Sequence, residues 1–165
     1  MWAKELYGFA DHVPETEEYG VASFVYRARR PFEPDKIMAV LNGELPGVIR
    51  AKGHFWIATR PDWVAEFSLA GALSSVKPMG TWWASVPQDR WPQHDSIDSY
   101  MATHWQDPWG DRRQEIVFIG SGIDWADIKG RLDAALVSED LATSPDALPD
   151  FPDPFPQWRR AEQAA

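Results

Sequence analysis

The candidate metal ligands of this chain are histidines and carboxylates, because the sequence contains no cysteine. The segment HDSIDSYMATH carries His94, Asp95, Asp98 and His104, and His12 stands before a run of acidic residues. Zinc sites favour ligands on one helical face or in a tight turn, and the six positions from Asp98 to His104 suit a helical pair poorly. The spacing favours ordinary surface or core-edge histidines, and the residues to test for a metal are His94, Asp98, His104 and His12.

The motifs of nucleotide binding and covalent catalysis are missing from this sequence. No glycine-rich loop ends in Gly-Lys-Ser or Gly-Lys-Thr, so P-loop phosphate binding by this chain is excluded. The turn Gly120-Ser121-Gly122 follows a predicted strand, as a dinucleotide-binding turn would, but Trp125 occupies the third glycine position. A tight turn before the last helix explains these glycines better. No nucleophile elbow or Ser/His/Asp context is present, and we predict that this chain is not an enzyme.

A charged run, Arg112-Arg113-Gln114-Glu115, stands immediately before the most apolar strand of the sequence. Paired arginines at such a position could bind an anion. The simpler interpretation, which we favour, is an ordinary charged strand start.

Basic and aromatic residues alternate with apolar ones from Val48 to Thr59, and successive strand side chains point to opposite faces. One face carries core residues, namely Ile49, Ala51, Gly53, Phe55 and Ile57. The other face carries Arg50, Lys52, His54 and Trp56, and a preceding strand adds Arg27 and Arg29. We predict that these six residues, Arg27, Arg29, Arg50, Lys52, His54 and Trp56, form a surface that docks an acidic protein segment. The alternative is a solvated sheet face on which long side-chain stems cover apolar neighbours.

Composition limits the classes of partner and compartment. A net charge of -9 argues against nonspecific nucleic-acid binding, which needs clustered lysine and arginine. No apolar run is long enough to span a membrane, and the first residues lack the apolar core of a secretory signal. Together with the absence of cysteine, these features predict a cytoplasmic protein. The ten tryptophans fit either an aromatic core or an exposed recognition surface.

The elements that must position these residues follow from hydrophobic periodicity and turn chemistry. A strand over 21–30 ends before Pro31, and a helix begins near Pro34 and ends at Gly43. An antiparallel hairpin joins 48–59 to 64–69 through Arg60-Pro61-Asp62. The signal weakens over 74–107, where Met79-Gly80-Thr81-Trp82-Trp83 and 87–92 look irregular and 96–106 could form a helix. A buried strand at 116–119 precedes a helix capped by Asp124.

This order, β-α-β-β-(α)-β-α, predicts an α+β fold: a sheet of about four mainly antiparallel strands with helices packed on one face, for which a ferredoxin-like arrangement is one solution. We expect a leader and linker over 1–20, one domain over 21–140 and a tail rich in proline and aspartate over 141–165. Phe151, Phe155 and Trp158 could hold the tail against the domain.

Five blocks in this order resemble the C-terminal domain of CobW-like proteins: FVYRARRPFEPDKI, GVIRAKGHFWIATRPD, GTWWASVP, GDRRQEIVFIG and DPFPQW. The resemblance runs from about Tyr19 to Trp158, nearly the whole chain. CobW-like proteins are P-loop GTPases of metal delivery, and they include zinc metallochaperones and the cobalamin-biosynthesis protein CobW. In that family the GTPase half, absent from this chain, carries the nucleotide site and the metal motif.

The resemblance implies a non-catalytic interaction or regulatory domain that docks to its own GTPase domain, to client metalloproteins, or to both. No cofactor is expected in this chain itself, whereas zinc or cobalt and GTP with magnesium would act through the GTPase domain. No catalytic residue of the family maps onto these positions. The alternative is a regulatory module that binds a small molecule or a metal in a pocket between the Trp82-Trp83 loop and the sheet.

Overall fold

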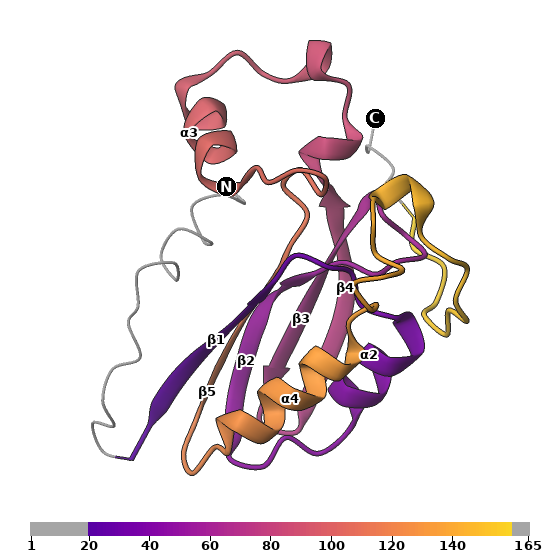
Figure 1. Cartoon of the computed structure of the whole chain (residues 1–165). Helices are drawn as coiled ribbons and strands as arrows, with labels where there is room; N and C mark the ends of the chain where they lie inside the picture. Colours follow the sequence, from indigo (N-terminus) through magenta and orange to yellow (C-terminus); the bar gives the residue numbers. More distant parts are fainter. Residues whose placement is uncertain (1–19, 160–165) are drawn as a thin grey trace.

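A five-stranded antiparallel sheet forms the centre of the computed structural model, which describes residues 20–159 (Figure 1). Its strands are β1 (Ala22–Ala28), β2 (Val48–Phe55), β3 (Trp63–Ala70), β4 (Leu73–Thr81) and β5 (Gln114–Gly120), in the spatial order β1-β5-β2-β3-β4. Because β1 and β2 are each antiparallel to β5, they are parallel to each other. The last strand in sequence therefore fills the gap of a split β-α-β unit.

Two helices, α2 (Pro34–Asn42) and α4 (Trp125–Ala135), lie on the same face of the sheet (Figure 1). Proline occupies the first turn of α2, and the side chain of Asp124 caps α4 by accepting a hydrogen bond from the Asp127 backbone N–H, at 3.1 Å. A third helix, α3 (Asp95–His104), lies beyond one end of the sheet together with the short 3₁₀ turns η1 (Trp83–Ser85) and η2 (Gln88–Arg90) (Figure 1). A further 3₁₀ turn, η3 (Pro145–Ala147), follows α4. None of the helices described is long and apolar enough to cross a membrane.

The main core lies between the sheet and these two helices. The strands contribute Tyr26, Phe55, Phe67 and Phe118, and the helices contribute Ile37, Leu41, Ile128 and Leu132, all of them buried. Burying side chains of this size is the main source of stability in a domain of this length. The predicted α+β class, the hairpin of β2 and β3 and the two flanking helices are confirmed.

Two sequence expectations about the sheet were wrong. Ile49, predicted to be a core residue, is 56% exposed, because the register of β2 against β5 shifts between Val48 and Arg50 and leaves Ile49 as the extra residue of a bulge. The stretch from Met79 to Trp83, expected to be irregular, begins inside β4, which is the fifth strand of a sheet expected to have about four. Pro78 is tolerated there because β4 is an edge strand.

A second, tryptophan-rich core lies near the end of the sheet where α3 sits. It contains Trp56, Trp82 and Trp109, together with Val64 and Val137. The Trp82 indole donates to the Trp63 carbonyl at 2.9 Å, and the Trp56 indole donates to the Arg29 carbonyl at 3.0 Å. The aromatic-core interpretation therefore holds for these three tryptophans, whereas Trp105 is 39% exposed.

The segment after η3 is held by three aromatic side chains that pack on the two cores and by one ion pair. Phe155 is buried in the main core, and Phe151 and Trp158 pack against the two cores as expected. The Arg60 guanidinium binds the Asp153 carboxylate, with Nε to Oδ2 at 2.8 Å, and donates to the carbonyls of Phe155 and Pro156.

Candidate functional site

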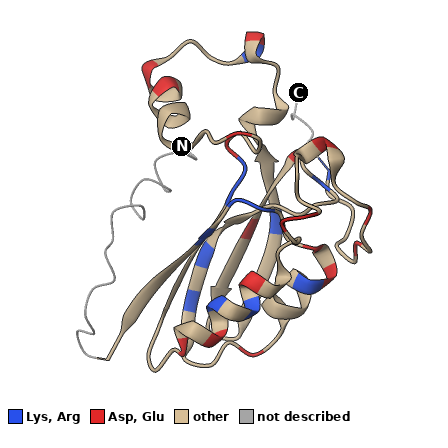
Figure 2. Ribbon diagram, in the orientation of Figure 1, with Lys and Arg blue, Asp and Glu red and all other residues tan. Residues whose placement is uncertain are grey.

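The two faces of the sheet have different surroundings. Tyr26, Ala51 and Phe118 point toward α2 and α4, so their neighbours in each strand point to the opposite side. On that opposite side, which we call the open face, lie Val25 and Arg27 of β1, Val117 and Ile119 of β5, and Arg50 and Lys52 of β2. Val117 is only 9% exposed, and Val25 and Ile119 are half-buried. Figure 2 shows the basic residues of β2 as two blue bands on the sheet. No helix of the described chain packs across the open face, and α3 lies only at its end (Figure 1).

The structure divides the six residues predicted for docking. Arg27, Arg50 and Lys52 are exposed on the open face, and Arg29 is half-buried. His54 and Trp56 are 1% and 0% exposed, so the prediction that they form part of a surface was wrong. The physical reason is the cover provided by the loops: His54 meets the edge of Trp82, and Trp56 packs on Trp109 with ring centroids 5.6 Å apart in each pair. The role of the other four in docking stays a prediction.

The charged run that leads into β5 is buried, which an ordinary charged strand start does not predict. Asp111, Arg112, Arg113, Gln114 and Glu115 are all 7% exposed or less. Such groups are stable in a core only when their hydrogen bonds are made. The run therefore has to be a structural polar network, and its contacts bear this out.

Asp111 joins α3, the loop after β4 and the start of β5. Its carboxylate accepts hydrogen bonds from the backbone N–H groups of Trp83 and Ala84, at 3.1 and 2.8 Å, and from the Tyr100 hydroxyl of α3 at 3.1 Å. Tyr100 is itself buried, and burial raises the pKa of its hydroxyl above its ordinary value. The hydroxyl is thus protonated and serves as a donor at neutral pH.

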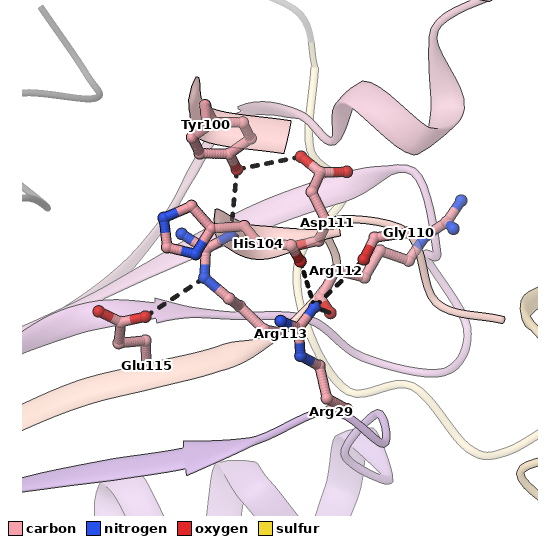
Figure 3. Close-up of polar contacts among 8 residues, drawn as sticks. All are labelled: Arg29, Tyr100, His104, Gly110, Asp111, Arg112, Arg113 and Glu115. Carbon is pink, nitrogen blue, oxygen red and sulfur yellow. Dashed lines mark hydrogen bonds and ion pairs between the residues drawn. The ribbon is translucent and has the colours of Figure 1, made fainter. Parts of the chain in front are cut away.

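Arg113 extends the network along the strand (Figure 3). Its Nε binds the Glu115 carboxylate at 3.2 Å, and its Nη1 donates to the Tyr100 hydroxyl and the Asp111 carbonyl, each at 3.0 Å. Nη2 is buried and has no hydrogen-bond partner within residues 20–159.

Two further arginines bind backbone carbonyls. Arg112 donates to the carbonyls of Pro61 and Trp109 at 2.7 and 3.1 Å. Nη1 of Arg29 lies 2.6 Å from the His104 carbonyl, 3.1 Å from the Gly110 carbonyl and 3.5 Å from the Arg112 carbonyl (Figure 3). Arg29 thereby fixes the end of α3 to the start of β5, so it has a structural role that a docking residue would not need.

Burial and the nearby arginines together keep two imidazoles, those of His54 and His104, neutral. Burial, and after it the charges of Arg113, Arg29 and Arg27, lower the pKa of His104 to about 4. Burial, and after it Arg113, holds the pKa of His54 well below its ordinary value. Neither imidazole is in its positively charged, doubly protonated form at neutral pH. The charge of this region therefore comes from its guanidinium and carboxylate groups.

We expect the stability of the domain to fall as the pH drops from about 6.5 to about 4, in part through His104. The unfolded chain takes up a proton near the ordinary histidine pKa, whereas the folded chain resists it, so this contribution is present above 6.5 and is lost toward 4. Urea unfolding of His104→Gln at several pH values should show a shallower fall than the wild type. The exposed His94→Gln variant is the control, and an equal pH dependence in both variants would contradict the prediction.

The residues considered for a metal do not converge. His94 caps α3 and accepts from the Ser96 backbone N–H at 3.1 Å, whereas His104 is the last residue of the same helix and packs on Tyr100. Asp98 is exposed in the first turn of α3, and His12 lies outside the described residues. Within residues 20–159, no three histidine or acidic side chains are grouped so as to hold a metal ion.

A pocket was expected between the Trp82-Trp83 loop and the sheet. The structure has a hollow beside the residues that follow this loop, on the side that faces α3. It has a volume of about 660 Å³ and is lined by residues that follow Trp83 and by Trp91, Met101 and Trp105. It lies between the loop and α3 rather than between the loop and the sheet.

Sequence reasoning missed Tyr100 and Asp111 as the centre of the network. One signal was present: five consecutive polar residues stand directly before the apolar stretch Ile116–Ile119. A strand this apolar lies inside a sheet, between two other strands, so the residues that lead into it are drawn toward the interior.

Comparison with known proteins relates this arrangement to a family. The model of the cobalamin synthesis protein cobW C-terminal domain matches residues 21–136. The chain is 42% identical over 122 residues to zinc-regulated GTPase metalloprotein activator 1 of Dictyostelium discoideum, across 72% of this chain and 25% of that protein. It is 35% identical over 139 residues to the zinc chaperone Rv0106 of Mycobacterium tuberculosis, across 84% of this chain and 35% of that protein.

Among solved structures, the Zn(II)-bound YjiA GTPase from E. coli matches with a TM-score of 0.50 at 17% identity, across 72% of this chain and 30% of that one. At this level of identity the likeness concerns the fold. The chain spans only 25% to 35% of the length of the two curated relatives, so most of each relative has no counterpart in it.

Proposed function

The chain belongs to the family of the cobalamin synthesis protein cobW C-terminal domain, and from this premise we propose that it is a non-catalytic interaction domain that docks on the GTPase part of a zinc chaperone. Two relatives are named as a zinc-regulated GTPase and a zinc chaperone, and both are far longer than this chain. Zinc or cobalt, and GTP with magnesium, would then be bound by the part of such a protein that this chain lacks.

The observation that carries the proposal is the open face. Val25, Val117 and Ile119 of β1 and β5 lie beside the basic side chains Arg50 and Lys52 of the central strand β2, and Arg27 lies near the end of the edge strand β1. At the far edge of the same face, Leu73 is 80% exposed. Exposed basic side chains next to apolar ones suit contact with a protein surface of complementary charge. Because the whole chain has a net charge of -9, basic residues gathered on one face favour an acidic partner surface.

Docking through this face gives the domain a regulatory role. A nucleotide-dependent change in the GTPase part would alter the surface that meets the sheet, and the two parts would pack differently in the two nucleotide states. Client metalloproteins would compete for the same face or bind beside it. The main core lies on the other side of the sheet, so a partner can contact the open face without disturbing that core.

The test is isothermal titration calorimetry of this chain with the part of the D. discoideum relative outside the matched region. We expect Arg50→Glu combined with Lys52→Glu to weaken binding by about tenfold or more, because two attractive charges of the open face become repulsive. Arg29 is a poor choice for reversal because its guanidinium holds three backbone carbonyls. The matched control is Lys36→Glu with Lys129→Glu, which makes the same change in net charge at side chains 52% and 53% exposed on the helices.

Equal loss of affinity in both double variants would show that only net charge matters and would contradict docking through the open face. The same calorimeter separates the second candidate function, a small-molecule or metal-binding module, which the hollow beside Trp91 and Trp105 favours. Binding of GTP or zinc by this chain, without binding of the GTPase part, would support that candidate instead.

A further inference from the structure

A groove of about 540 Å³ opens where the open face meets the C-terminal end of α3. Its wall is formed by the end of β1, the last residues of α3 and the start of β5. The charged side chains along it are those of Arg27, Arg29, Arg113 and Glu115, and Thr103 and His104 contribute from the helix. The groove therefore joins the exposed margin of the open face to the buried network.

Positive charge exceeds negative charge in this groove. Three guanidinium groups line it against one carboxylate, that of Glu115, which already binds Arg113 Nε at 3.2 Å. All the hydrogen bonds of Arg29 described above go to backbone carbonyls, which leave its formal charge in place. Nη2 of Arg113 has no hydrogen-bond partner among the described residues, so one buried donor of this guanidinium is unused.

The neighbouring imidazoles report the same positive potential. After burial, the causes that lower the pKa of His104 are Arg113, Arg29 and Arg27, all of which line the groove. Burial, and after it the charge of Arg113, lowers the pKa of Arg29, as expected for two guanidinium groups that repel each other. In a chain of net charge -9, a local excess of this kind selects for an anion.

We infer that the groove receives one carboxylate side chain, an aspartate or glutamate, from the protein that docks on the open face. A planar carboxylate matches the paired N–H groups of a guanidinium, and it brings a single negative charge. A phosphate dianion would bring twice that charge close to Glu115, which forms part of the same wall. Arg27 belongs to both the groove and the open face, so a partner seated on the sheet reaches the groove without a gap. The inference rests on the proposed docking function and names the chemistry of its anchor.

The direct experiment follows the Nε–H signals of the arginines by NMR in the full chain. The probes are acetyl-Gly-Glu-Gly-amide, the matched acetyl-Gly-Gln-Gly-amide and inorganic phosphate, each at low salt. We expect the glutamate peptide to shift the signals of Arg27 and Arg113, the glutamine peptide to leave them in place, and added salt to reverse the shift. Arg27→Gln should reduce the shift of the Arg113 signal, whereas Arg50→Gln, outside the groove, should preserve it.

Equal shifts with both peptides, or none with either, would overturn the inference, and a stronger response to phosphate would assign the groove to a phosphate instead. The calorimetric experiment with the GTPase part separates the two proposals. Arg27→Glu should weaken that binding by about tenfold. Binding that is insensitive to Arg27 would refute the anchor and leave docking intact. A shift with the glutamate peptide, but no binding of the GTPase part, would refute docking and leave the carboxylate preference intact.

Discussion

Replacing Asp111 with alanine is expected to lower the free energy of unfolding by about 3–5 kcal/mol. The carboxylate is 0% exposed and accepts three hydrogen bonds, two from backbone N–H groups of η1 and one from the Tyr100 hydroxyl. Its loss leaves these three donors without their acceptor. Because domains are stable by only about 5–15 kcal/mol, this single change removes a large share of the total.

Urea unfolding monitored by tryptophan fluorescence measures the effect of Asp111→Ala, and Asp107→Ala is the matched control. Asp107 accepts one hydrogen bond, from the Trp105 indole at 3.1 Å, but it is exposed. The control should change the free energy of unfolding by less than about 0.5 kcal/mol. Losses of similar size in both variants would contradict the prediction, because they would show that burial of the Asp111 carboxylate adds nothing to the free energy of unfolding.

Replacing Gln114 with alanine is expected to cost about 2–4 kcal/mol, because its amide replaces ladder hydrogen bonds where the strands separate. Its Oε1 accepts from the Trp56 backbone N–H at 2.8 Å, and its Nε2 donates to the carbonyls of Arg30 and Trp56 at 2.9 and 3.0 Å. Trp56 and Arg30 follow the ends of β2 and β1, so one side chain ties both strand exits to β5.

The Gln114→Met variant separates hydrogen bonding from packing, because methionine nearly preserves the volume. We expect Gln114→Met to lose most of the stability that Gln114→Ala loses. The exposed Gln88→Ala is the control for the amide itself. If Gln114→Met were as stable as the wild type, a cavity rather than the missing hydrogen bonds would explain the alanine result.

The elements that could be predicted from the sequence are those whose signals are local. Pro34 and Gly43 mark the ends of α2, Asp124 marks the start of α4, and Arg60-Pro61-Asp62 marks the hairpin turn. Each depends on residues only a few positions apart. The family resemblance likewise depended on short blocks in order, and the match of the domain model to residues 21–136 confirms it.

The features that could not be predicted depend on partners distant in sequence. β4 reads as LSSVKPMGT, a polar segment with proline and glycine, and it becomes a strand because β3 offers it an edge. The bulge at Ile49 follows from the fit between β2 and β5. A charged run normally indicates a solvated surface. The run before β5 is buried because Tyr100 and the backbone of Trp83 happen to meet Asp111 there.

The docking residues also depend on contacts between segments that are distant in sequence, because such contacts decide which of these residues are exposed. Of the six residues predicted for docking, three are on the exposed open face, and the other three are partly or fully enclosed by the loops and α3. The alternation along β2 was correct in direction, because Arg50, Lys52 and His54 do share one side. The alternating pattern could not predict that Trp82 and Trp109 cover the last part of this face, at His54 and Trp56.

The place of β5 between β1 and β2 has a consequence for synthesis on the ribosome. The chain is made from its N-terminus, so β1, β2, β3 and β4 all emerge before the strand that joins the first two of them. The β2-β3-β4 meander can form early from neighbouring segments, but one side of β2 stays without a partner until Gly120 has been made. An unpaired strand edge is prone to pair with other chains, so the nascent protein is most vulnerable to aggregation during that interval. The exposed edge of β2 is therefore removed only when β5 has been synthesised and has paired with it.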